Sequence, residues 1–83
     1  MAATERLDVR GLLCPLPVLR AAARVAALGR GAVLEVLADD PLFRLDVEAW
    51  CAREGHELVA VEESPGGVRC LLRVGTQRSG SVQ

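Results

Sequence analysis

The chain has 83 residues, of which 51% are hydrophobic and 25% charged, and its net charge is −1. This composition is typical of one small folded domain, whereas the absence of a basic excess and the scarcity of aromatic residues argue against nucleic-acid binding. Because no apolar run approaches the roughly 18 residues of a membrane span and the N-terminus lacks a hydrophobic signal region, we expect a cytoplasmic protein with no membrane contact.

The first third of the chain predicts a strand followed by a helix. Leu7 and Val9 alternate with charged residues over positions 5–10, which indicates a half-buried strand. Residues 16–28 are rich in alanine and leucine and favour a helix, which Gly29 would end as a left-handed cap. The predicted apolar stripe of this helix consists of Val18, Leu19, Ala22, Val25 and Ala26.

The middle of the chain predicts a central strand and a second helix. Residues 32–38 are aliphatic and β-branched, and residues 42–54 carry apolar side chains at helical spacing. We interpret Asp39 and Asp40 as N-cap residues and Pro41 as part of the first helical turn. The alternative is that the two aspartates are paired catalytic carboxylates. The predicted buried residues of this helix are Phe43, Val47, Trp50 and Cys51.

The last third predicts a β-hairpin. Gly55 suits a helix C-cap, and residues 56–63 and 68–74 read as strands on either side of the turn sequence at 64–67. The polar tail 76–83 is expected to be disordered. The second strand of the hairpin places four apolar side chains on one face: Val68, Cys70, Leu72 and Val74.

The predicted order is βαβαββ, which makes the fold class α/β (α+β). Right-handed crossovers would place both helices on one face of a four-stranded mixed sheet, in a two-layer sandwich. We expect one domain over residues 1–83, ordered from about 5 to 75. The other face of the sheet should meet water because charged residues occupy alternate strand positions: Asp8, Glu35, Arg69 and Arg73.

Cys14 stands at the junction of the first strand and the first helix. Pro15 disfavours helical backbone angles at Cys14, so the cysteine should be an N-cap-like residue with Pro15 at the first helical position and Pro17 within the first turn. The positive end of a helix favours a thiolate, which predicts a moderately lowered pKa, and Arg10 and Arg20 could add positive field. The alternative is that Cys14 is a buried small apolar residue.

The remaining residues of chemical interest have simpler interpretations. Cys51 and Cys70 fall on apolar faces and are expected in the core as free thiols. His56 is interpreted as a capping or packing residue, and Asp46 as a further cap or a solvated charge. A Cys3His zinc site is compatible with the residue count, but the spacing matches no zinc-finger pattern, so no metal is expected.

Two segments resemble the TusA/SirA-like sulfur-carrier family: LDVRGLLCPLPVL, with its Cys-Pro-x-Pro motif, and ADDPLFRLDVEAWCAREGHEL. The resemblance spans residues 7 to about 74. It implies a two-layer βαβαββ fold and a sulfurtransferase, needing no cofactor, that holds a persulfide on Cys14. It further implies a cysteine desulfurase or rhodanese-like donor and an acceptor protein, in thiolation of tRNA, molybdenum-cofactor synthesis or sulfur metabolism.

Leu16 departs from the family members that serve tRNA thiolation, because those tend to carry an acidic residue between the two prolines. This difference puts the tRNA pathway in doubt. We expect a monomer whose specificity comes from the surface around the thiol. The alternative function is a regulatory or redox-sensing interaction module without sulfur transfer. The expected docking residues are Pro15, Leu16, Pro17, Arg10, Arg20 and Arg24.

Overall fold

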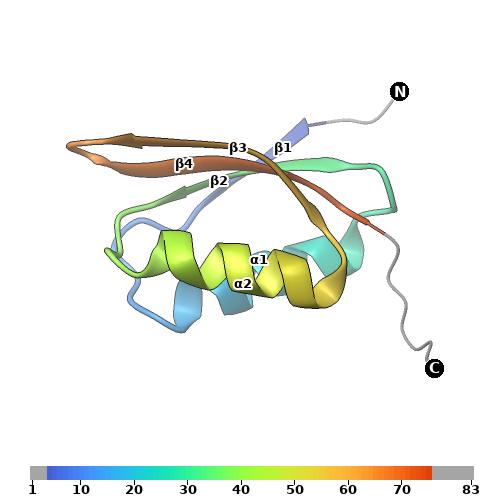
Figure 1. Cartoon of the computed structure of the whole chain (residues 1–83), viewed down its shortest axis with the longest axis horizontal. Helices are drawn as coiled ribbons and strands as arrows, with labels where there is room; N and C mark the ends of the chain where they lie inside the picture. Colours follow the sequence, from blue (N-terminus) through green and yellow to red (C-terminus); the bar gives the residue numbers. More distant parts are fainter. Residues whose placement is uncertain (1–3, 76–83) are drawn as a thin grey trace.

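The computed structural model describes residues 4–75, in which four strands and two helices follow one another in the predicted βαβαββ order (Figure 1). The predicted disordered tail at 76–83 lies outside the described residues. The elements are β1 (Thr4–Asp8), α1 (Leu16–Ala27), β2 (Val33–Ala38), α2 (Phe43–Glu54), β3 (Glu57–Ser64) and β4 (Gly67–Arg73).

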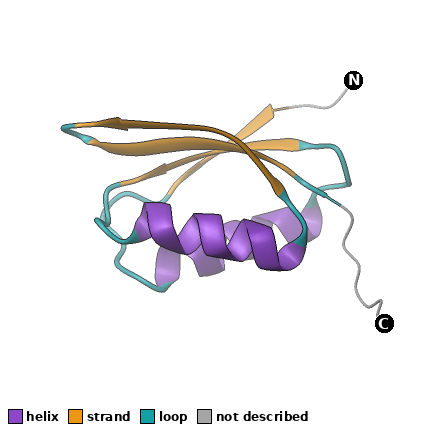
Figure 2. Cartoon of the chain, in the orientation of Figure 1, coloured by secondary structure: helices purple, strands orange, loops and turns teal. Residues whose placement is uncertain are grey.

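The four strands form one mixed sheet in the order β1-β2-β4-β3. β1 and β2 are parallel because α1 connects them as a crossover, and β4 is antiparallel to both β2 and β3. Both helices cover the same face of this sheet (Figure 2), so the predicted two-layer sandwich is confirmed. Within residues 4–75, neither helix combines the length and the apolar character needed to cross a bilayer.

The two helices differ in how well the sequence pattern predicted their buried faces. In α2 the four predicted residues are all buried, and Cys70 and Leu72 of β4 lie in the same core. In α1 the fully buried residues recur every fourth position at Pro17, Ala21 and Val25. The predicted stripe was wrong at Leu19, which is 56% exposed, and at Ala26, which is also exposed, because the face turned to the sheet is narrow and is lined by smaller residues.

The end of each helix was also tested by the structure. Gly55 has a φ of +84° and ends α2 as the predicted left-handed C-cap, where its N–H donates to the Cys51 carbonyl. The prediction for Gly29 was wrong. Helix α1 ends at Ala27, and Leu28 leaves the helix in an extended conformation without a left-handed residue.

The prediction that Asp39 and Asp40 cap α2 was wrong as well. The helix begins at Phe43 with Leu42 as its N-cap, and no side chain caps it. Pro41 therefore precedes the helix instead of forming its first turn. Both aspartates bond the loop that follows β1, and Asp40 also accepts the Leu42 N–H, as described below.

The face of the sheet away from the helices carries charged side chains, as predicted. The Arg6 Nε donates to Glu35 at 2.8 Å, and Arg69 donates to the second oxygen of the same carboxylate. Arg69 also reaches Glu62 on the neighbouring strand at 3.1 Å. These side chains join all four strands of the sheet, and the two arginines cover the nearly buried Glu35 carboxylate.

Candidate functional site

The loops that follow β1 and β2 meet at one edge of the sheet, because parallel strands end at the same side. Two aspartates of the second loop bond the backbone of the first. The Asp39 carboxylate accepts the Gly11 N–H at 2.9 Å, and one oxygen of Asp40 accepts the Cys14 N–H at 2.7 Å. The other oxygen of Asp40 accepts the Leu42 N–H at 3.2 Å. These bonds position the cysteine against the start of α2.

Cys14 is exposed and lies just outside α1, as predicted, although the details of the helix start differ by one residue. Pro15 is the N-cap and Pro17 the second helical residue. The Cys14–Pro15 peptide bond is cis, and the Leu16 N–H donates to the Leu13 carbonyl at 2.9 Å. The alternative of a buried structural cysteine is therefore excluded for this residue.

The electrostatic prediction for Cys14 was wrong. Hydrogen bonding of the thiol to the Asp46 carboxylate raises the pKa of Cys14 above its ordinary value, partial burial of the sulfur raises it further, and the negative charges of Asp46 and Asp40 add to the effect. The sulfur and one oxygen from each carboxylate lie within 4.8 Å of one another. Asp46 was expected to be a cap or a solvated charge, and the fold makes it the closest ionic neighbour of the thiol.

Two of the three arginines predicted to surround the thiol form ion pairs with other residues. Arg10 forms an ion pair with Asp8 at 2.7 Å, and Arg24 pairs with Glu5 at 3.0 Å. Arg20 is exposed on α1. The charged groups that shift the pKa of the thiol are all carboxylates. The prediction that arginines add a positive field at the thiol was therefore wrong.

Five leucines with large exposed fractions, between 43% and 66%, lie on the two segments that meet at the cysteine, residues 13–19 and 42–45. Leu13 and Leu16 stand within two residues of Cys14, and Leu42 and Leu45 within four residues of Asp46. The sequence analysis had selected only Leu16. We call this set the leucine rim: Leu13, Leu16, Leu19, Leu42 and Leu45.

His56 lies away from the thiol and has a packing role, as predicted. Its Nδ1 accepts the Gly75 N–H at 3.0 Å, and its ring packs against Trp50 with the ring centroids 4.9 Å apart. Burial lowers the pKa of His56. Helix α2 has 12 residues and is about 18 Å long, with Asp46 in its first turn and His56 beyond its last.

Cys51 and Cys70 are buried in the core, where burial raises the pKa of each thiol, to about 11 and about 12. They do not join Cys14, so the described residues assemble no Cys3His site. The sulfur of Cys14 and the carboxylates of Asp40 and Asp46 are close enough for a metal ion to touch all three. Both oxygens of Asp40 already accept backbone N–H groups, however, which gives this residue a structural role.

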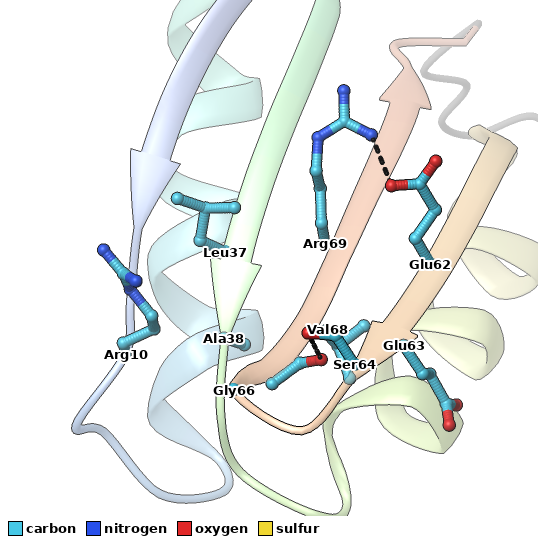
Figure 3. Close-up of a pocket in the computed structure, with 10 residues that line it drawn as sticks. Arg10, Leu37, Ala38, Glu62, Glu63, Ser64, Gly66, Val68 and Arg69 are labelled. Carbon is cyan, nitrogen blue, oxygen red and sulfur yellow. Dashed lines mark hydrogen bonds and ion pairs between the residues drawn. The ribbon is translucent and has the colours of Figure 1, made fainter.

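A separate hollow lies on the face of the sheet away from the helices (Figure 3). Leu37, Arg69 and Glu62 point into it, and the ion pair between the last two crosses it at 3.1 Å. None of its lining residues is on α1 or α2, and it contains no thiol. The chemistry-bearing site is therefore the edge with Cys14.

Comparison with known proteins agrees with this geometry. Residues 5–74 match the family model described as Sulfurtransferase TusA. The sulfur carrier protein TusA of Allochromatium vinosum is 39% identical over 69 residues, which cover 83% of this chain and 91% of that protein. The TusA protein of Pseudomonas entomophila is 43% identical over 60 residues, covering 72% of this chain and 75% of that one.

Two further similarities concern length and fold. The protein YrkF of Bacillus subtilis is 39% identical over 79 residues, and this chain spans 43% of its length. The crystal structure of a SirA-like protein from Desulfitobacterium hafniense superimposes with a TM-score of 0.75 at 30% identity, covering 86% of this chain and 97% of that one. The family match over residues 5–74 includes the β1–α1 junction that carries Cys14.

Proposed function

Because the chain belongs to the sulfurtransferase TusA family, we propose that it is a sulfur carrier that holds a persulfide on Cys14. The observation that supports this proposal most is the contrast among the three cysteines. Cys14 is exposed beside a helix start, whereas Cys51 and Cys70 are buried in the core. A carrier needs one accessible sulfur, and only Cys14 meets that condition.

The proposed chemistry is thiol exchange and requires no organic cofactor. The sulfur of Cys14 attacks the outer sulfur of a donor persulfide. A new S–S bond forms on Cys14, the S–S bond of the donor breaks, and the donor cysteine leaves as a thiolate that takes up the proton lost by Cys14. An acceptor thiolate then attacks the outer sulfur on Cys14 in the same way, and Cys14 is restored as a thiol.

The leucine rim supports a protein as the partner at each step. Large exposed apolar side chains that gather at one place on a small domain mark interaction surfaces. We propose that a cysteine desulfurase or a rhodanese-like protein docks there as donor, with Pro15 and Leu16 beside the sulfur. Pro17 is buried and contributes by fixing the start of α1.

Three arginines belong to the same proposal as outer contacts. Arg20 is exposed on α1, and Arg10 and Arg24 form ion pairs with exposed partners. Exposed ion pairs contribute little free energy and can exchange partners readily. We propose that these side chains bind acidic groups at the margin of a docked protein. The carrier is proposed to be a cytoplasmic monomer that does not bind nucleic acid, and Leu16 argues against thiolation of tRNA as its pathway.

The test is intact-protein mass spectrometry after incubation with a cysteine desulfurase and free cysteine, repeated with a rhodanese-type donor. We expect the wild type to gain one sulfur that a reductant removes. Cys14→Ser should fold and gain none, while Cys51→Ala serves as a control that retains loading if it folds. Absence of loading with both donors, together with partner binding that survives in Cys14→Ser, would replace the carrier with the regulatory interaction module.

A further inference from the structure

The fold brings two charged side chains to Cys14, and both of them are acidic. Asp46 approaches from the first turn of α2, and Asp40 from the loop between β2 and α2. Asp40 is held in place by two backbone N–H groups, and its residue is 4% exposed. Arg10, the nearest arginine in the sequence, is bound by Asp8 through two hydrogen bonds between their side chains. A nucleophilic cysteine is usually surrounded by positive groups instead.

We infer that Asp46 keeps Cys14 as a neutral, weakly reactive thiol in the free carrier, and that sulfur transfer begins when the docked donor places a cationic side chain against Asp46. This inference rests on the proposed function and adds a controlling residue to it. The Asp46 carboxylate lies within 4.8 Å of the reacting sulfur and acts on its proton, whereas Asp40 acts by positioning the backbone of Cys14.

The surface around the thiol fits a cationic group from a partner. The leucine rim would exclude water when a protein covers it, and electrostatic attraction between charges strengthens when water is excluded. An acidic centre surrounded by apolar side chains therefore favours a partner with a basic residue in an apolar patch. Small oxidants and alkylating agents would reach the same sulfur without bringing such a charge.

Docking then changes the balance of protonation at the sulfur. The cation pairs with the Asp46 carboxylate, which weakens the hold of that carboxylate on the thiol proton. The sulfur of Cys14 bonds to the outer sulfur of the donor persulfide and releases its proton. The donor S–S bond breaks, and its electron pair and the proton end on the donor cysteine. No oxidant or reductant is consumed.

The first experiment uses the free protein and no donor. The rate at which iodoacetamide alkylates Cys14 is measured against pH for the wild type, Asp46→Asn and Asp46→Ser. We expect both variants to react severalfold faster near neutral pH, with the midpoint of the profile moved to lower pH, because removing a negative charge favours the thiolate. Glu54→Gln removes an exposed charge from the last turn of α2, at the end of the helix away from Asp46, and should leave the profile unchanged.

The second experiment follows loading of Cys14 by a cysteine desulfurase at increasing salt. Loading of the wild type should slow as salt screens the pairing with Asp46, and the salt dependence should weaken in Asp46→Asn. An alkylation profile that is identical in all variants would overturn this inference and leave the carrier function intact. A shifted profile with no sulfur loading of the wild type would overturn the carrier function instead. If loading of the wild type and of Asp46→Asn depended equally on salt, the proposed cationic side chain of the donor would be refuted.

Discussion

The carboxylate of Asp40 accepts the backbone N–H of Cys14 at 2.7 Å, although 26 residues separate them in the chain. The same carboxylate accepts the N–H of Leu42 with its other oxygen. One buried side chain therefore joins the cysteine loop to the start of α2. The backbone of Cys14 is therefore held by a bond from another loop as well as by the start of α1.

Asp40→Ala should destabilise the protein by about 2 to 4 kcal/mol, because two backbone N–H groups lose a charged acceptor in a buried position. Chemical denaturation followed by circular dichroism measures this loss. Asp39→Ala is the matched control: its carboxylate is exposed and accepts one N–H, so the loss should stay below about 1 kcal/mol. Equal losses in both variants would contradict the bridging role of Asp40.

Leu45→Ser should slow the loading of sulfur by a protein donor about tenfold while leaving stability and alkylation of Cys14 unchanged. The side chain is 66% exposed, so it contributes contact area to a partner and little to the core. Initial rates of persulfide formation measure the effect. Val59→Ser alters an exposed apolar residue on β3 and should have no effect on loading. A comparable loss in the Val59 variant would argue against a localised docking surface.

Gly67→Ala should destabilise the protein by about 2 to 3 kcal/mol. Gly67 has a φ of +137° and a methyl group there would overlap the carbonyl oxygen of Ala38. Thermal unfolding measures the loss. Gly66→Ala lies at the neighbouring position, where a methyl group meets nothing within 4 Å, and it should be nearly neutral. If the two variants melted together, the close approach of the β3–β4 turn to β2 would be refuted.

Glu35→Gln should reduce the dependence of stability on pH in the acidic range. Hydrogen bonds from the guanidinium groups of Arg6 and Arg69 lower the pKa of Glu35 below its ordinary value. A lowered folded-state pKa stabilises the protein above the unfolded-state pKa, and this contribution is lost as the pH falls through the folded value. Urea unfolding at a series of acidic pH values measures it. An unchanged slope in Glu35→Gln would contradict the pairing of Glu35 with the two arginines.

Labelling of thiols near pH 8 should modify Cys14 alone in the folded protein. Burial shields Cys51 and Cys70 from reagents and raises their pKa values to about 11 and about 12, so that few thiolates form. Peptide mass spectrometry after brief alkylation identifies the modified sites. Adding denaturant should expose all three thiols, and rapid native labelling of Cys70 would contradict its place in the core.

Local patterns in the sequence determined most of the fold. Each local pattern indicated one kind of element: the apolar spacing indicated helix α2, the alternation indicated strand β4, and the turn residues indicated the β3–β4 hairpin. The order of these elements predicted a two-layer sandwich. The position of Cys14 outside α1 also followed from local chemistry, since a proline restricts the residue before it. The Cys-Pro-x-Pro segment, together with the second resembling block, indicated the family that the comparison of residues 5–74 confirmed.

The charges that determine the protonation of the Cys14 thiol are placed by the tertiary structure alone. Asp40 and Asp46 are 26 and 32 positions from Cys14 in the chain, and no local pattern places them beside it. They arrive there because β1 and β2 are parallel and adjacent, so the segments that follow the two strands converge at one edge. A helix start by itself predicts a lowered thiol pKa, but charges at short distance outweigh the partial charge of a helix end, and both of these charges are negative.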